Sequence, residues 1–189
     1  MNRQNTQHEP AGFLFRTAES RDIPEAAQIE QVCFPPNEAC TPERMRERAE
    51  AAPDLFLLAV DRESGKIAGY LNGIAADDAS FDDAFFTDAS LHNPEGRNCF
   101  LMSLCVLPPY RGKGLAHSIM REYAGREKAR GREALILTCL EEKVSLYESM
   151  GFSDLGASAS VWGGEAWHEM ICTLDPDRAG GACRSGKTQ

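Results

Sequence analysis

A glycine-containing turn between an apolar strand and a helix is the part of this sequence best suited to chemistry. The segment reads LCVLPPYRGKGLAHSIM, and Gly112 and Gly114 stand just before apolar residues with helical spacing. Glycine has no Cβ, so an anion can approach the backbone N–H groups that such a turn presents at the positive end of a helix dipole. The Walker pattern and the three-glycine dinucleotide motif are both absent from the sequence. The turn therefore predicts a phosphate-binding loop of another kind, with an ordinary strand-to-helix connection as the alternative.

The elements that must position this turn are indicated by apolar spacing and by helix-start signals. A strand is expected at 13–18, and Asp22 opens a helix that a double proline at 35–36 ends. That helix is expected to bury, on one face, Ala26, Ile29, Val32 and Cys33. Thr41 and Pro42 open a second helix, because one supplies a capping hydroxyl and the other needs no N–H partner.

The rest of the chain alternates strands and helices. Further strands are expected at 55–61, 66–74, 100–107 and 134–140, further helices from 115 and from 144, and a closing hairpin at 161–174 that turns at Gly163 and Gly164. A long Asp-rich loop with three Phe residues is expected at 77–98. This order predicts an α/β (α+β) fold, with a mixed, mostly antiparallel sheet of about seven strands flanked by four helices. One domain is expected at 12–174, between a disordered N-terminal segment, 1–11, and a disordered C-terminal tail, 175–189.

Composition and charge exclude several classes of protein. The chain has 189 residues, with 20 Lys and Arg against 29 Asp and Glu, a net charge of −9 and a pI near 5.0. Binding to nucleic acid or to an anionic membrane needs clustered basic residues, so neither partner is expected. No apolar run is long enough to cross a bilayer and the first residues lack an export signal, so a cytoplasmic location is expected. Seven cysteines without a CxxC pair predict neither a disulfide framework nor a metal site.

The run Arg111–Ala116, RGKGLA, matches the signature R/Q-x-x-G-x-G/A of the GNAT superfamily of N-acetyltransferases. The order of the elements expected at 12–174 also resembles the fold of that superfamily. Within it the chain is most similar to the arylalkylamine (serotonin) N-acetyltransferases, through the segments FPPNEAC, LCVLPPYRGKGLA, LYESMGF and WHEMICTL. The resemblance implies a GNAT fold and acetyl-CoA as cosubstrate, with no metal.

The resemblance also implies which residues hold the cofactor. Backbone groups of 104–106 would hold the pantetheine arm, amides of 112–117 would hold the diphosphate, and Thr138 and Cys139 would border the cofactor. The expected cofactor-binding residues are Leu104, Cys105, Val106, Arg111, Gly112, Lys113, Gly114, Leu115, Ala116, His117 and Thr138. A strand amide is already fixed in place, so it suits the charge that collects on a thioester carbonyl oxygen.

Two side chains are expected to move protons. Alkylamines have a pKa near ~10 and are mostly protonated at neutral pH, so a proton must leave before the nitrogen attacks. Insect members of the family suggest Glu38 for this step, unless Glu38 only binds the ammonium group or caps the helix that starts after Thr41. A phenol can protonate the departing thiolate, and the matching residue is Tyr147, whose alternative role is core packing beside Val144 and Met150.

The fourth strand lacks the histidine pair of the vertebrate arylalkylamine enzymes, because Phe100 and Met102 stand at the matching positions. None of the histidines at 8, 92, 117 and 168 is an evident substitute. The amine is expected to contact Phe34, Pro35, Glu38 and Met102. The Phe residues of the 77–98 loop suit its apolar part.

These features together predict an acetyl-CoA-dependent N-acetyltransferase that acts by direct attack of a small primary amine, an arylalkylamine or a polyamine. An acyl-cysteine at Cys105 or Cys139 would need a paired base, and the sequence shows none beside them. Two alternatives stay open, a protein lysine or N-terminal acetyltransferase and a noncatalytic acyl-CoA-binding sensor. The expected partner is the small-molecule amine, and the protein is expected to be a monomer or a dimer.

Overall fold

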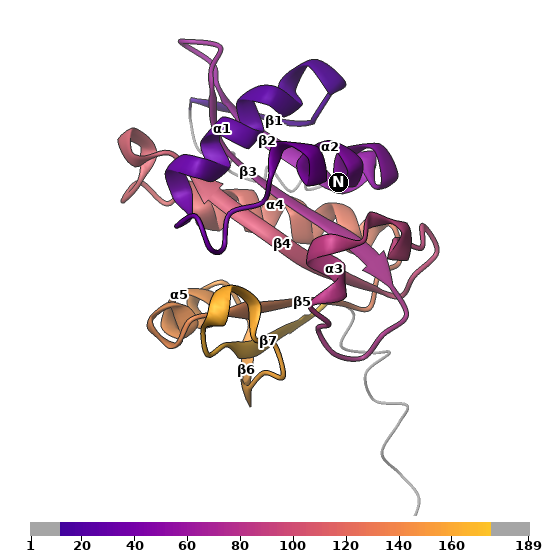
Figure 1. Ribbon diagram of the computed structural model, residues 1–189. Helices are drawn as coiled ribbons and strands as arrows, with labels where there is room; N and C mark the ends of the chain where they lie inside the picture. The colour runs from indigo at the N-terminus through magenta and orange to yellow at the C-terminus, as the bar shows by residue number, and fades with distance from the viewer. Residues whose placement is uncertain (1–11, 175–189) are drawn as a thin grey trace, which may run out of the picture.

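The computed structural model describes residues 12–174, and the two predicted disordered ends, 1–11 and 175–189, lie outside the described residues. One seven-stranded sheet runs through the described part in the order β1-β2-β3-β4-β5-β7-β6, with β4 and β5 as its parallel pair (Figure 1). The strands are β1 Phe13–Thr17, β2 Phe56–Asp61, β3 Ile67–Ala76, β4 Asn98–Val106, β5 Ala134–Cys139, β6 Ser153–Ala157 and β7 His168–Thr173. The predicted mixed, mostly antiparallel sheet is therefore confirmed.

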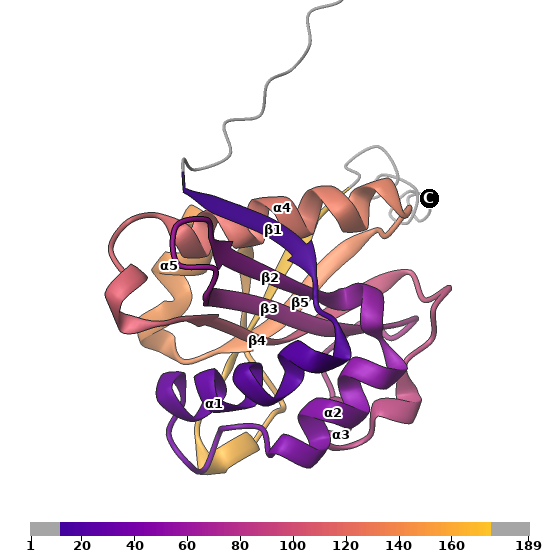
Figure 2. The same ribbon diagram turned by 90° about the horizontal axis from the view of Figure 1, so that it is seen from above.

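Helices cover both faces of the sheet. They are α1 Ile23–Cys33, α2 Pro42–Ala51, α3 Ala84–Thr87, α4 Leu115–Ala129 and α5 Val144–Ser149. Figure 2 shows α4 on one face, with α1 and α2 on the other, and each side has its own apolar cluster. Helix α2 begins as predicted, because Pro42 is its first residue and Oγ1 of Thr41 accepts a hydrogen bond from the N–H of Arg44, 3.3 Å away. None of the helices within 12–174 is long and apolar enough to span a bilayer.

The described chain has five α-helices where the sequence predicts four. The additional one, α3, lies within the expected 77–98 loop and has 4 residues, too few to produce a helical apolar pattern. Phe81 and Phe85 are 5 % and 3 % exposed, and the ring centroids of Phe85 and Phe100 lie 4.5 Å apart. These buried rings fix the segment against β4, so it is a packed element and not a solvated loop.

The closing hairpin differs from the prediction in its first arm. Strand β6 pairs with β7, and the connection between them contains Gly163 and Gly164. β6 is a mostly exposed edge strand without apolar alternation, so its residues give little strand signal. The predicted first arm instead forms a loop that contacts the segment after α1, where Nε1 of Trp162 donates to the carbonyl oxygen of Glu38, 3.1 Å away.

Helix α1 buries a carboxylate that the apolar pattern does not predict. Val32, expected on the buried face, is 57 % exposed, whereas Glu30 is 2 % exposed. The carboxylate of Glu30 accepts hydrogen bonds from the hydroxyl of Tyr70 on β3 and from the hydroxyl of Ser103 on β4. Burial of a polar group is tolerated when partners satisfy it, and here those partners come from the sheet below the helix.

Strands β4 and β5 separate in the middle of the sheet. They pair only over 98–100 and 134–136, although both strands continue beyond these residues. On its other edge β4 pairs with β3, and Gly73 lies opposite Leu101 while Asn72 lies opposite Ser103. Met102 is therefore an extra residue of β4 and forms a β-bulge. A bulge bends its strand, so the bulge and the separation together open the sheet between β4 and β5.

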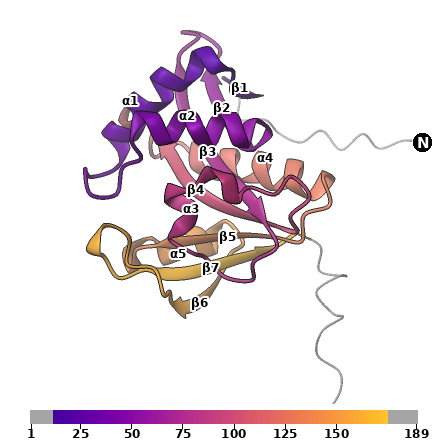
Figure 3. The same ribbon diagram turned by 45° about the vertical axis from the view of Figure 1, so that its right-hand side comes forward.

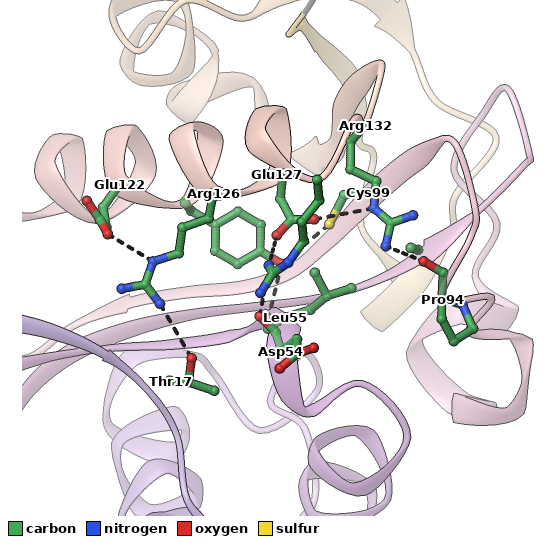
Figure 4. Close-up of polar contacts among 12 residues, drawn as sticks. Thr17, Asp54, Leu55, Pro94, Cys99, Glu122, Arg126, Glu127 and Arg132 are labelled. Atoms are coloured by element: carbon green, nitrogen blue, oxygen red, sulfur yellow. Dashed lines mark hydrogen bonds and ion pairs between the residues drawn. The ribbon is translucent and has the colours of Figure 1, made fainter.

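A buried ion-pair network fixes the end of α4 that lies away from the glycine turn (Figure 4). Glu127 is 1 % exposed and pairs with Arg130 and Arg132. Arg132 in turn donates to the carbonyl oxygen of Gly96 and to that of Pro94, the latter 2.7 Å away. The network joins α4 to the segment that leads into β4, and so holds the helix in register with the strand.

Candidate active site

An inner cavity lies between helices α1 and α2 and the separated part of β4 and β5. Figure 3 shows α1 and α2 on one side of this region, and β5, β6 and β7 on the other. Its charged lining residues are Glu30, Glu38, Arg44 and Arg48, and its aromatic lining residues are Phe34, Phe86, Tyr147, Trp162 and Trp167. The cavity therefore combines charges of both signs with aromatic and aliphatic side chains.

An outer groove runs along the ends of β4 and β5 toward the glycine turn. Cys33, Val106 and Arg111 border it on one side, and Cys139 borders it on the other. The inner cavity and the outer groove share six lining residues, which we call the junction: Phe34, Glu38, Leu104, Thr138, Tyr147 and Trp167. A molecule in the cavity and a molecule in the groove would meet at the junction.

Glu38 stands at the junction, on the loop between α1 and α2. Its side chain is half-buried, and burial, followed by the negative charges of Glu165 and Glu142, raises the pKa of its carboxyl group. A carboxylate with a raised pKa is a better proton acceptor. The predicted alternative, that Glu38 caps α2, is wrong, because Thr41 supplies the capping oxygen.

Two hydrogen bonds tie the Glu38 loop to the loop that precedes β7. Nε1 of Trp162 donates to the carbonyl oxygen of Glu38, and Nδ2 of Asn37 donates to the carbonyl oxygen of Gly163, 2.9 Å away. Gly163 has φ = 65°, a left-handed conformation that glycine adopts without strain. The two loops thus form one connected wall of the inner cavity.

Tyr147 reaches the junction from α5. Its ring packs edge-on against Phe152, with 5.8 Å between the centroids, so packing is one of its roles. Its hydroxyl group makes no hydrogen bond to any residue within 12–174. Burial, with smaller contributions from Cys139 and Cys105, raises the pKa of Tyr147, so the phenol keeps its proton throughout the neutral range.

The glycine turn presents unpaired backbone donors at the start of α4. Gly112 and Gly114 have φ = 73° and φ = 77°, and Ser118 is the first residue of α4 whose N–H finds an acceptor in the helix, the carbonyl oxygen of Gly114. The amides of 112–117 donate to no described residue, and no described side chain caps the helix. This arrangement fits an anion such as a diphosphate.

The predicted cofactor residues fall into two groups. Those that line the outer groove are Leu104, Val106, Arg111, Ala116 and Thr138. Those that do not line it are Cys105, Gly112, Lys113, Gly114, Leu115 and His117. Cys105 points to the buried Glu30, with 3.4 Å between Sγ and Oε2, and Nε2 of His117 lies 2.9 Å from Oγ of Ser149. Cys105 is therefore turned away from the groove, whereas the other five residues belong to the glycine turn or to the first turn of α4.

Of the predicted substrate residues, Phe34 and Glu38 lie at the junction. Pro35 lines only the outer groove, and Met102 lines only the inner cavity. Of the Phe residues in the 77–98 segment, only Phe86 lines the inner cavity.

Cys33 borders the outer groove beside Arg111. A hydrogen bond with Cys105, and then the guanidinium of Arg111, whose Nη2 lies 3.7 Å from Sγ, lower the pKa of Cys33 to about 7. Sγ of Cys33 also donates to the carbonyl oxygen of Val106, 3.6 Å away.

None of the histidines within 12–174 lines the inner cavity or the outer groove. Nδ1 of His92 accepts a hydrogen bond from the N–H of Ala75, 3.0 Å away, and burial lowers the pKa of His92. His168 pairs with Asp154, with 3.0 Å between Nδ1 and Oδ2. No group of three or more His, Cys, Asp or Glu side chains within 12–174 is placed to hold a metal ion. Glu38 and Tyr147 are therefore the proton-transfer candidates at the junction.

Sequence reasoning misses Glu30 and the arginine pair of α2. Arg44 and Arg48 are four residues apart and therefore share one face of the helix, which is the signal that could have found them. Glu30 gives no comparable signal, because a glutamate between Ile29 and Gln31 reads as an ordinary polar helix position and its partners lie on β3 and β4.

Comparison with known proteins gives one family and one fold. The model of the Acetyltransferase (GNAT) family matches residues 23–152, well over half of the chain. The chain is 17 % identical to the GphF GNAT-like decarboxylase in complex with isobutyryl-CoA, with a TM-score of 0.74 over 86 % of this chain and 100 % of that one. It is 21 % identical to the GNAT family N-acetyltransferase YhbS from Escherichia coli in complex with CoA, with a TM-score of 0.62 over 93 % of this chain and 89 % of that one. It is 18 % identical to the ribosomal-protein-S18-alanine N-acetyltransferase from Escherichia coli, with a TM-score of 0.64 over 92 % and 99 % of the two chains. At these identities the solved structures establish the fold.

Proposed function

This chain belongs to the acetyltransferase (GNAT) family, and from that premise we propose that it acetylates a small primary amine of the arylalkylamine type. It uses acetyl-CoA as cosubstrate, in keeping with the coenzyme A and isobutyryl-CoA bound by two of the similar proteins. The observation that carries the proposal is the junction, where Glu38 and Tyr147 line both the inner cavity and the outer groove.

The outer groove and the glycine turn suit coenzyme A. The unpaired amides of 112–117 would bind the diphosphate, and the side chains of Leu104, Val106 and Thr138 would border the pantetheine arm. When bound, the cosubstrate supplies an acetyl group as a thioester. The separation of β4 from β5 leaves the end of β4 without a strand partner on that side, where the carbonyl oxygen of Val106 accepts from Nε of Arg111, 2.8 Å away.

Glu38 and Tyr147 can move the protons that the transfer requires. The amine nitrogen forms a bond to the acetyl carbon while the carbon–sulfur bond breaks. The nitrogen loses two protons: one leaves to solvent through Glu38, and the other replaces the proton that Tyr147 gives to the sulfur. The products are the N-acetyl amine and coenzyme A, so no acyl-enzyme is needed.

The wall of the inner cavity favours an aromatic amine. Phe34, Phe86, Trp162 and Trp167 line it, and the rings of Phe86 and Trp162 stack with 4.8 Å between centroids. Stacked and edge-on contacts with such rings favour an aromatic ligand over a flexible aliphatic one. A polyamine is disfavoured by the two arginines in the same wall, and a long peptide is disfavoured by the two hydrogen-bonded loops beside the junction.

A turnover assay tests this proposal. The purified chain is incubated with acetyl-CoA and, in separate reactions, phenylethylamine, tryptamine, spermidine and a lysine peptide, and free thiol is followed. We expect thiol release with phenylethylamine and tryptamine at a kcat/KM well above that with spermidine or the peptide. Release only with the peptide would instead identify a protein acetyltransferase. Calorimetric binding of coenzyme A without release in any reaction would identify a sensor.

A further inference from the structure

Two arginines in the inner cavity have no carboxylate partner among the described residues. Arg48 is 4 % exposed and donates to two neutral acceptors, Oδ1 of Asn72 at 3.2 Å and the carbonyl oxygen of Phe86 at 3.3 Å. Arg44 is half-buried, and its guanidinium lies 6.0 Å from the ring centroid of Trp162. Neither forms an ion pair with any residue within 12–174, and the side chain of Arg44 makes no hydrogen bond there.

The acidic residues of the cavity do not supply the missing counter-charge. The carboxylate oxygens of Glu30 already accept hydrogen bonds, including one from the N–H of Cys40 at 3.1 Å and one from the hydroxyl of Ser103 at 2.9 Å. Glu38 lies at the junction and forms no ion pair with Arg44 or Arg48. A buried cation without an anion beside it is unfavourable, so this end of the cavity is suited to a negatively charged group.

We infer that the amine substrate also carries a carboxylate, which Arg44 and Arg48 bind. The inference rests on the proposed function, because it places the amino group of the same molecule at Glu38. Both arginines line the inner cavity and neither lines the outer groove, so the carboxylate lies at the end of the cavity away from acetyl transfer. A guanidinium binds a carboxylate through two parallel N–H···O bonds, and Arg44 has these donors available.

The aromatic side chains connect the two charged ends of the cavity. Trp162 contacts Phe86 by stacking and Arg44 through its ring face, and its Nε1 donates to the backbone of Glu38. A ligand that extends from Glu38 to Arg44 would therefore pass along an aromatic surface. The substrate class is an aromatic aminocarboxylate.

Three matched substrates test the inference. Phenylethylamine has no carboxylate, phenylalanine carries one beside the amino group, and 4-(2-aminoethyl)benzoate carries one at the far end of the ring. We expect at least one of the two carboxylates to have a kcat/KM tenfold or more above that of phenylethylamine at low ionic strength.

Variants of Arg44 on α2 test whether this arginine causes the preference for a carboxylate substrate. In Arg44→Gln the ratio of kcat/KM for the preferred carboxylate to that for phenylethylamine should fall at least tenfold. Arg44→Lys keeps the charge but loses the two parallel N–H donors of the guanidinium, so its ratio should lie between those of the wild type and Arg44→Gln. Arg46→Gln is the matched control, because Arg46 is exposed and lines neither the inner cavity nor the outer groove, and it should keep the wild-type ratio.

Calorimetry with 3-phenylpropionate, which has the carboxylate but no amine, provides a readout that does not depend on turnover. We expect it to bind the wild type and to bind Arg44→Gln at least tenfold more weakly. The inference is wrong, and the proposed function stands, if kcat/KM for phenylethylamine equals that for both carboxylates and Arg44→Gln leaves the ratio of these values unchanged. If no amine releases thiol although coenzyme A binds, the proposed function is wrong. In that case the calorimetric titration with 3-phenylpropionate decides on the carboxylate site. Weaker binding to Arg44→Gln than to the wild type supports the site, and equal binding or no binding contradicts it.

Discussion

Tyr147 and Glu38 both line the junction, and their surroundings shift both pKa values upward with different consequences. Burial keeps the Tyr147 phenol protonated, which a proton donor needs. Burial and two neighbouring carboxylates make Glu38 more basic than an exposed glutamate, which a proton acceptor needs. The shift strengthens Glu38 as a proton acceptor, whereas it leaves Tyr147 protonated without making the phenol a stronger acid.

Removal of the Tyr147 hydroxyl tests the donor role. In Tyr147→Phe we expect kcat to fall about 100-fold, because general acid catalysis typically contributes that much, and the Kd of coenzyme A to change by less than about twofold. Stopped-flow thiol release and calorimetry measure the two quantities. Tyr110→Phe is the control, since the Tyr110 hydroxyl binds Asp61, 2.9 Å away, and lines neither the inner cavity nor the outer groove. Equal loss in both variants would assign Tyr147 a packing role only.

Replacement of Glu38 by Gln tests the acceptor role through the pH profile. In the wild type kcat/KM should rise as Glu38 ionises, at a pH above the ordinary glutamate range because its pKa is raised. In Glu38→Gln only the amine already free in solution reacts, so the profile should shift upward toward the amine pKa near ~10. Glu165→Gln should shift the profile slightly downward, because it removes a negative charge that raises the Glu38 pKa. A Glu38→Gln profile that overlays that of the wild type would exclude Glu38 as the base.

At the scale of elements, ion pairs fix the C-terminal end of α4, whereas the backbone N–H groups at its N-terminal end have no partner among the described residues. Its last turn joins the segment before β4 through Glu127 and Arg132, both labelled in Figure 4, and Arg130 also pairs with Glu127. Its first turn has unpaired amides beside Gly114. Anchoring at the far end allows the near end to present donors in fixed positions without a protein cap.

Loss of that anchor should destabilise the fold. Glu127→Ala leaves two guanidinium groups without their buried partner, so we expect a loss of about 3 kcal/mol in the free energy of unfolding. Glu122→Ala on the same helix is the control. Its ion pair with Arg126 spans one turn at a more exposed position, and its loss should cost about 0.5 kcal/mol or less. Urea denaturation followed by circular dichroism compares the two, and similar midpoints would show that the network is not a structural anchor.

At the scale of the whole molecule, the opening between β4 and β5 divides the sheet. Strands β1 to β4 with α1 and α2 lie on one side, and β5 to β7 with α5 lie on the other (Figure 1). The parallel contact between the two parts covers three residues on each strand. A ligand in the outer groove touches both parts, because Leu104 and Val106 belong to β4 and Thr138 belongs to β5.

Coenzyme A should therefore stabilise the whole fold. At 100 times its Kd, a ligand that binds only the native state adds about 2.7 kcal/mol, and this should raise Tm by about 5–10 °C. Differential scanning calorimetry measures the shift. Hydrogen exchange should show added protection in β4 near Leu104 and in β5 near Thr138. Protection on one strand alone would place the ligand outside the groove.

The sequence alone determined the start of one helix, the apolar strands and the motifs of the family, because these depend on residues that are close together in the chain. The Thr41–Pro42 start of α2 and the apolar strands follow from capping and side-chain spacing, which act over a few residues. The RGKGLA run and the FPPNEAC and LYESMGF segments likewise indicate the family and the candidate proton carriers, because their residue types and spacing are contained within short segments. Short and exposed elements such as α3 and β6 lack enough residues or apolar alternation to be predicted in this way.

Only the tertiary structure decided what surrounds the amine. Glu30 is buried because Tyr70 and Ser103 come to it from two strands, and Trp162 reaches Glu38 across a sequence separation of more than 120 residues. Arg44 and Arg48 become a candidate carboxylate site only because the opening between β4 and β5 places a cavity beside them. Burial and charge compensation depend on all the groups that converge at a point, and the order of residues along the chain does not specify which groups those are.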